Sequence, residues 1–351
     1  MKAETIAMIG TRGHYGTVLR EMEVMPSLRL VASADGGDSV APIVGWCRQH
    51  GHAPQMFDDY RTMLDRAKPD VLVVCGPFEA HAAMCIDAVE RGVHVITEKP
   101  AALTLAELEK LSAACERHPN MHVAGMMFSR YDAGFFTAKG LIDSGAVGDV
   151  RLINARKSYR LGTRDPHYHR REMYGGTIPW VGSHAIDWAM WMGNQPFTRV
   201  YATHSARDNG GNGTMERSAL CHFTLAGERF ASVSIDVFRP DKAPTHGDDW
   251  IRVVGTAGVL EARPESVMLI NADNDGSKPV PVGCDRSFLR DFVDHVEGRG
   301  RMCIDTRSTL ELTRACLLAR ESADEGRIVE FEEPPSLSPA LSPELGRGRT
   351  L

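Results

Sequence analysis

The stretch Thr5-Ile6-Ala7-Met8-Ile9-Gly10-Thr11-Arg12-Gly13-His14-Tyr15-Gly16 decides the fold. Residues 5–9 are apolar and predict a short buried strand, and a helical stretch follows with apolar side chains at Val18, Leu19, Met22 and Met25. A pyrophosphate needs a tight turn, close backbone approach and the amides of a helix N-terminus, and glycine permits the first two because it lacks Cβ. The spacing is G-x-x-G-x-x-G rather than the strict G-x-G-x-x-G, but it falls at the first strand-to-helix turn. We therefore expect a dinucleotide to bind across Gly10–Gly16.

A carboxylate follows the second predicted strand. Residues 28–34 form that strand, and Asp35 ends it at about the distance where a carboxylate accepts hydrogen bonds from an adenosine ribose. The alternative is that Asp35 only makes a turn before Gly36-Gly37. Asp35 would repel a 2′-phosphate, which favours NAD as the cofactor, whereas Arg12 could neutralise that phosphate, so NADP stays possible.

Strands and helices alternate up to about residue 125. Helices are predicted near residues 42–50, 81–91 and from 104 onward, and strands at 70–75, 93–97 and 122–125. This order is typical of an α/β protein with a doubly wound parallel sheet of the Rossmann type. We assign residues 1–124 to a dinucleotide-binding domain.

The pattern changes after residue 125. Strands at 150–159, 200–204, 218–225 and 230–238 follow one another closely, with helices near 135–144, 183–193, 287–297 and 306–325. Closely spaced strands predict a C-terminal α+β domain, residues 125–331, with a large and mostly antiparallel open sheet. Residues 332–351 are rich in Pro, Ser and Arg and predict a flexible tail.

Composition excludes several classes of protein. The 351 residues carry a net charge of −6 with no basic face, so we expect no nucleic-acid partner. No apolar run approaches a membrane span, and no signal-peptide pattern begins the chain. The eight cysteines form no C-x-x-C pair, which favours buried free thiols and a cytoplasmic location.

A second motif lies at Thr97-Glu98-Lys99-Pro100, where a predicted strand delivers Glu98, Lys99 and Pro100 to its carboxyl end. Other segments follow in order: Gly76–His81, Gly175-Gly176, Gly182–Asp187, Val254–Gly258 and Ala319–Val329. Their sequence and spacing resemble the glucose-fructose oxidoreductase / inositol dehydrogenase / MocA (Gfo/Idh/MocA) family over about residues 4–331.

The resemblance implies NAD(P)-dependent oxidation of a sugar, cyclitol or related secondary alcohol, in a homodimer or homotetramer built through the second domain's sheet. It implies that Lys99 and His184 are catalytic, and that the Lys99–Pro100 bond is often cis. The implied cofactor contacts beyond the glycine loop and Asp35 are Pro77, His81, Glu98, Lys99 and Pro100. The implied substrate contacts are Arg164, His167, Tyr174, Trp180 and Asp187.

The chemistry of such a site needs an acceptor for the hydroxyl proton. We expect Lys99 to hold that oxygen, with a pKa lowered by burial. His184, with Ser183 as a helix N-cap, suits acid–base work near neutral pH, and Asp187 one turn later could orient it. Glu98 is expected to contact the ribose or the nicotinamide side rather than to act as a base.

Trp180 departs from the family pattern, because catalytic relatives usually carry Asp four residues before this histidine. An indole accepts no proton, so either Lys99 and His184 carry the proton relay alone or the chemistry differs. The alternatives are a non-catalytic dinucleotide-binding regulator and a lyase-like or hydrolytic enzyme that recycles NAD. The basic loop at 164–174 could bind a carboxylate or polyol, or it could be merely solvated. Its single His167-x-His169 pattern is a weak signal for a metal site, so no metal is expected.

Overall fold

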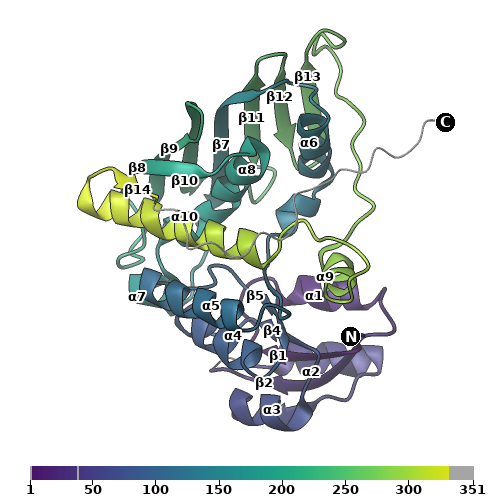
Figure 1. The fold of residues 1–351 in the computed structure, drawn as a ribbon. Helices are drawn as coiled ribbons and strands as arrows, with labels where there is room; N and C mark the ends of the chain where they lie inside the picture. The colour runs from purple at the N-terminus through teal and green to yellow at the C-terminus, as the bar shows by residue number, and fades with distance from the viewer. Residues whose placement is uncertain (1, 38, 332–351) are drawn as a thin grey trace, which may run out of the picture.

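The computed structural model describes residues 2–37 and 39–331, which form two sheets with helices around them (Figure 1). The first sheet has six strands in the order β3-β2-β1-β4-β5-β6, all paired in parallel. Its strands are β1 (Thr5–Ile9), β2 (Arg29–Ala34), β3 (Gln55–Phe57), β4 (Val71–Val74), β5 (His94–Thr97) and β6 (Val123–Gly125). This is the predicted doubly wound Rossmann sheet.

Helices connect these strands because each carries one apolar face that the sheet covers. They are α1 (Tyr15–Met22), α2 (Ala41–His50), α3 (Tyr60–Ala67), α4 (His81–Val89) and α5 (Leu105–Arg117). The predicted capping box begins α5, since Thr104 Oγ1 accepts from the Glu107 amide and the Glu107 carboxylate accepts from the Thr104 amide.

The second sheet has eight strands in the order β13-β12-β11-β7-β10-β9-β8-β14. Only the β7–β10 pair is parallel, so the mostly antiparallel sheet is confirmed. Its strands are β7 (Val150–Arg160), β8 (Phe197–Ser205), β9 (Ser218–Leu225), β10 (Arg229–Arg239), β11 (Trp250–Gly255), β12 (Val259–Arg263), β13 (Ser266–Ile270) and β14 (Val329–Glu330). The prediction missed β3, β11, β12 and β13 because strands of three to six residues carry little periodic signal.

The helices of this part are α6 (Ala133–Asp143), α8 (Ser183–Gly193), α9 (Phe288–Val296) and α10 (Thr306–Glu325), with short helical turns η2 (Phe128–Tyr131), η3 (Pro166–His169), α7 (Arg171–Tyr174) and η4 (Ile178–Gly182). Helix α10 lies between the two sheets (Figure 1). Its Thr309 hydroxyl accepts from the Gly125 amide of β6, and its Ser322 hydroxyl accepts from the Ala202 amide of β8. One helix therefore ties β6 of the first sheet to β8 of the second.

Two properties expected from composition can be compared with the fold. Six of the eight cysteines are buried, as predicted for free thiols. Among residues 2–37 and 39–331, no helix combines the length and apolar character of a membrane span. The domain boundary at 124/125 stays a prediction, and the predicted tail at 332–351 lies outside the described residues.

Candidate active site

The glycine loop between β1 and α1 has the shape that a pyrophosphate requires. Gly10 and Gly13 have φ of +71° and +64°, a backbone region that favours glycine. A Cβ on Gly10 would lie 2.5 Å from the Cys75 carbonyl oxygen, and one on Gly13 would overlap the Glu98 carboxylate. No side chain caps α1, so the positive end of its dipole faces the loop and the site fits an anion there.

Glu98 holds this loop in place. Its carboxylate is almost fully buried and accepts from the His14 amide at 2.6 Å and from the Lys99 amide at 2.8 Å, and it also contacts the His14 ring. Burial opposes ionisation, but the charge and hydrogen bonds of His14, with Lys99, outweigh it and hold the pKa of Glu98 at about 2. Both carboxylate oxygens thus bind the chain and Glu98 shapes the loop, while its contact with a cofactor stays a prediction.

His81 has a similar indirect role. Its ring is fully buried, with one nitrogen 3.0 Å from the Pro100 carbonyl oxygen and the other 3.1 Å from that of Gly76. It joins the loop after β4, which contains Pro77, to the Lys99–Pro100 bond, which is cis. A direct contact between His81 and a cofactor is thus wrong, because no ring atom is exposed to meet one.

Asp35 and Arg12 flank the adenosine end of the predicted crevice. Asp35 ends β2 and accepts from the Gly37 amide at 3.0 Å, so it makes the turn that was the alternative interpretation. Arg12 lies over the Phe78 ring at 5.9 Å and 3.9 Å from the Glu79 carboxylate. The ribose contact of Asp35, and the choice between NAD and NADP, remain predictions.

Lys99 links the segment after β5 to the turn that leads into α8. The residue is 7% exposed, and its amine donates to the Trp180 carbonyl oxygen at 2.6 Å. Burial lowers the pKa of Lys99 to about 8, Glu98 opposes the shift, and Lys157 adds to it. The predicted depression of this pKa is confirmed in direction and cause.

His184 lies in the first turn of α8, buried beside the same lysines. Its Nδ1 is 3.4 Å from the Ser129 hydroxyl, and within the described residues its Nε2 has no hydrogen-bond partner. Burial first, and then the charges of Lys157 and Lys99, hold its pKa well below the ordinary value. The expectation of a histidine that titrates near neutral pH is therefore wrong: the ring stays neutral.

The start of α8 also differs from the prediction. A π-helical turn at Ile178–Gly182 runs directly into the helix, so Gly182 is already helical and Ser183 is not a cap. The Ser183 hydroxyl instead donates to the Trp180 carbonyl oxygen at 3.0 Å. Trp180 thus presents one carbonyl to both Ser183 and the Lys99 amine.

Asp187 neither orients His184 nor reaches a substrate. It is fully buried, and Arg130 donates to both of its oxygens, from Nε at 2.9 Å and from Nη2 at 2.5 Å. The assigned substrate contact is wrong because both oxygens are committed to this ion pair.

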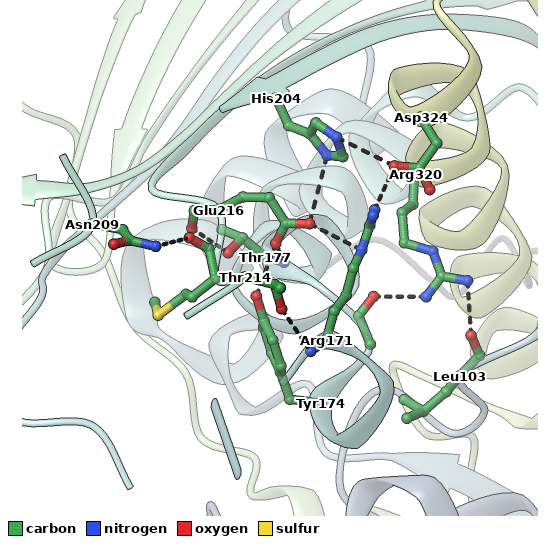
Figure 2. Close-up of polar contacts among 12 residues, drawn as sticks. Leu103, Arg171, Tyr174, Thr177, His204, Asn209, Thr214, Glu216, Arg320 and Asp324 are labelled. Atoms are coloured by element: carbon green, nitrogen blue, oxygen red, sulfur yellow. Dashed lines mark hydrogen bonds and ion pairs between the residues drawn. The ribbon is translucent and has the colours of Figure 1, made fainter. Parts of the chain in front are cut away.

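Tyr174 is likewise removed from the substrate set. Its hydroxyl donates to Glu216 at 2.8 Å inside a buried network (Figure 2). Glu216 also accepts from the Thr177 amide and pairs with Arg171 Nε at 3.0 Å, and Arg171 pairs with Asp324 of α10 at 2.7 Å. This network fixes the chain that leads into Trp180.

The loop before α7 covers the site with aromatic rings. Trp180 is 7% exposed and packs against Tyr168, with centroids 4.4 Å apart. Arg164 lies over the Trp180 ring at 5.0 Å. His167 lies against Tyr168 at 4.1 Å and against Phe78 of the first half at 5.9 Å. Arg164, His167 and Trp180 are therefore brought together at the Lys99 end of the crevice.

Lys157 and Asp249 belong to the site but were not predicted. The Lys157 ammonium pairs with Asp249 and lies 4.7 Å from the Tyr159 ring and 5.3 Å from that of Trp188. Burial opposes its charge, but Tyr159 and Asp249 outweigh burial and raise the pKa of Lys157. A signal did exist: Ile153, Ala155 and Lys157 share the inward face of β7 at period two.

The described ranges contain no group of three or more His, Cys, Asp or Glu side chains arranged to hold a metal.

Comparison with known proteins agrees with this geometry. Residues 5–126 match the NAD-binding Rossmann-fold domain of an oxidoreductase family, and residues 135–261 match the GFO/IDH/MocA C-terminal domain. This chain belongs to the Gfo/Idh/MocA oxidoreductase family. It is an NAD-binding oxidoreductase of that family, as the resemblance predicted.

Three proteins illustrate how similar this chain is to known relatives. A Thermotoga maritima protein, named provisionally as an oxidoreductase, has a solved structure that is 38% identical, with a TM-score of 0.88 over 93% of this chain and 100% of that one. D-glucoside 3-dehydrogenase of Escherichia coli is 24% identical over 87% of this chain and 90% of its own. Inositol 2-dehydrogenase of Rubrobacter xylanophilus is 25% identical over 95% of both.

Proposed function

We propose that this protein transfers hydride between NAD(P) and a secondary alcohol or its carbonyl on a sugar, cyclitol or related polyol. The observation that carries the proposal is the buried Lys99 amine, at the carboxyl end of β5, with its pKa at about 8. A general base or acid works best when its pKa lies near the operating pH. The two dehydrogenases described above act on a glucoside and on inositol, which supports this substrate class.

The dinucleotide fits the loop at Gly10–Gly16, with the ribose beside Asp35 and NAD favoured over NADP. When bound, the nicotinamide supplies the acceptor or donor of hydride. The neutral Lys99 amine then takes the hydroxyl proton, and the resulting ammonium donates a hydrogen bond to the oxygen. The Trp180 carbonyl holds the amine in place. His184, neutral and with Nε2 unpartnered in the described chain, is positioned to hydrogen-bond the same hydroxyl.

Stopped-flow absorbance at the reduced-nicotinamide band, with a panel of sugars and polyols, tests the proposal. Lasting reduction of NAD by at least one alcohol is expected. Lys99→Met should lower the rate by about 10²- to 10⁴-fold, because a general acid–base group contributes that much, while NADH binding is kept. Unchanged turnover in Lys99→Met would refute the role of Lys99.

Trp180 favours a second candidate function. It places an indole where catalytic relatives carry Asp, and the Lys99 amine is bound by a backbone carbonyl instead of a carboxylate. Transient reduction in the same experiment would indicate a lyase or hydrolase that recycles NAD. Binding of NADH without any reduction would indicate a regulator.

We also propose a homodimer or homotetramer through the outer face of the second sheet. Leu220 of β9, Phe230 of β10 and Tyr201 of β8 are 54%, 42% and 46% exposed on these adjacent strands. Exposed apolar patches of this kind mark association surfaces. A Leu220→Asp and Phe230→Asp double variant should be monomeric by light scattering after size exclusion, and a monomeric wild type would contradict the proposal.

A further inference from the structure

Arg164 contacts the same tryptophan, Trp180, as the Lys99 amine. It follows β7, and its guanidinium carbon is 5.0 Å from the Trp180 ring centroid and 6.0 Å from that of Tyr168. The carbonyl of the same Trp180 accepts from the Lys99 amine at 2.6 Å. Trp180 therefore contacts both groups, the amine through its carbonyl oxygen and the guanidinium through its ring.

The other arginines of this loop have carboxylate partners. Arg170 pairs with Glu172 at 2.8 Å, and Arg171 pairs with Glu216 and Asp324. Arg164 differs, because no carboxylate of the described ranges lies within 4.0 Å of its nitrogen atoms. Its Nη2 donates to the Arg160 carbonyl oxygen at 3.0 Å, and its Nε is buried without a hydrogen-bond partner.

A half-buried guanidinium without a counter-ion is energetically costly. Burial lowers the pKa of Arg164, and Tyr168, Tyr159 and Asp165, in that order, oppose the shift without cancelling it. Asp249 is not available to Arg164 either, because it pairs with the Lys157 ammonium. Within the described residues, Arg164 therefore has no ion-pair partner to neutralise its charge.

We propose that Arg164 binds an anionic substituent of the substrate, so that the alcohol oxidised at Lys99 belongs to a sugar or cyclitol bearing a carboxylate or a phosphate. This inference rests on the proposed function. The guanidinium lies over the Trp180 ring, and Nη2 donates to the Arg160 carbonyl oxygen. The Nε hydrogen has no partner among the described residues, and a guanidinium offers such anions two parallel hydrogen bonds.

The experiment compares acidic sugars with their neutral counterparts. D-glucuronate and D-glucose 6-phosphate are each compared with D-glucose, and D-galacturonate with D-galactose, by NAD reduction and by calorimetric binding to the protein–NADH complex. The variants are Arg164→Gln and Arg164→Lys, with Arg170→Gln as a matched control, since Arg170 is exposed on the same loop and paired with Glu172. The carboxylate and phosphate arms distinguish the two anions.

Wild type should prefer at least one acidic sugar over its neutral counterpart by about tenfold or more. Arg164→Gln should lose about 10- to 100-fold for that acidic sugar and less than about twofold for the neutral one, the range of a charge-assisted hydrogen bond. The loss for the acidic sugar in Arg164→Lys should be smaller than in Arg164→Gln, because lysine keeps the positive charge but lacks the planar guanidinium. Arg170→Gln should match wild type.

Two results would overturn the inference. One is an acidic preference that is absent in wild type or retained in Arg164→Gln. The other is a loss confined to NADH affinity, which would make the dinucleotide's own pyrophosphate the anion that Arg164 binds. If no sugar reduces NAD, the proposed function fails on its own, and the calorimetric comparison still decides whether Arg164 selects an anionic sugar.

Discussion

At the scale of single residues, Lys99, Lys157 and His184 show how one site sets three different protonation states. Burial disfavours charge on all three. Lys157 keeps its charge because Asp249 and Tyr159 compensate, and that charge then lowers the pKa of the other two. Groups whose environments push their pKa values apart are typical of acid–base sites.

The first prediction concerns this coupling. Replacing the Lys157–Asp249 pair by Lys157→Met with Asp249→Asn removes a buried pair without leaving one charge alone. Without the Lys157 charge, the pKa of Lys99 should rise, so the inflection in kcat/KM should move to higher pH and the rate at pH 7 should fall by roughly 3- to 10-fold. An inflection unchanged from wild type would show that Lys157 does not tune Lys99.

The second prediction concerns His184. Its pKa lies well below the ordinary value of 6.5, so its ring should still be neutral at pH 6.5, where a free imidazole is half protonated. The ring ¹⁵N shifts of labelled protein, assigned with His184→Asn, should be those of a neutral imidazole at that pH. A protonation midpoint near 6.5 would contradict the burial and lysine repulsion described above.

Residue-level prediction succeeded where a motif was local and failed where partners were distant. Lys99 was found because it follows a strand directly. Asp187 was misassigned because its partner Arg130 lies 57 residues away, and Asp249 was missed because it lies 92 residues from Lys157. No sequence spacing marks such pairs.

At the scale of elements, the glycine loop and Glu98 form one unit, which gives the third prediction. Gly13→Ala should lower the free energy of unfolding by about 1–3 kcal/mol, because alanine is strained in the left-handed backbone of this position. It should also weaken NADH binding, because the new methyl group displaces the Glu98 carboxylate. Gly51→Ala is the matched control, with φ of +74° and no atom within 4 Å of the place that its methyl group would occupy. It should lose about 1 kcal/mol and bind NADH normally. Equal NADH affinities in both variants would contradict the role of Glu98.

The fourth prediction concerns the network in Figure 2. Glu216→Gln removes the charge that Arg171 and the Tyr174 hydroxyl face, and it should cost about 3 kcal/mol in urea unfolding, as loss of one partner of a buried pair does. Glu172→Gln, at an exposed pair, should stay within about 0.5 kcal/mol of wild type. Equal costs would show that Glu216 does not fix the segment before Trp180.

Elements with local signals were predicted well. The capping box at Thr104 needs only residues within one turn. The start of α8 was misjudged because the π-turn at residues 178–182 depends on tertiary packing around Trp180 and Gly182, whose added Cβ would overlap Ile235 of β10.

At the scale of the whole molecule, three histidines connect the amino ends of β5 and β6 to α9. His94 stacks on His122 with centroids 5.3 Å apart, and His122 lies 4.4 Å from His295. Burial, followed by the charges of the other two histidines, lowers the pKa of His122 to about 4, and burial lowers that of His94.

The fifth prediction follows from the lowered pKa values of these histidines. The unfolded chain binds protons at these histidines near pH 6.5, whereas the folded chain binds one at His122 only near pH 4, so stability is present above pH 6.5 and declines as the pH falls between these values. Urea unfolding at pH 7.5 and at pH 5 should show a smaller difference for His122→Gln than for wild type. A difference as large as that of wild type would place the acid sensitivity elsewhere.

The order of strands in the first sheet follows from the right-handed alternation of strands and helices. The order in the second sheet was beyond prediction, because the parallel β7–β10 pair joins strands about 80 residues apart through side chains that carry no local code for register. The Lys99 amine of the first half donates to the Trp180 carbonyl oxygen of the second, and no spacing in the sequence marks a contact across 81 residues.

The central claim is that Lys99 moves the proton of the reacting hydroxyl, and the pH dependence of kcat/KM for NAD reduction tests it most directly. Wild type should show an inflection near pH 8, the pKa of the buried amine, and Lys99→Met should lose both that inflection and about 10²- to 10⁴-fold in rate. A Lys99→Met profile that keeps the inflection and the rate of wild type would contradict the claim.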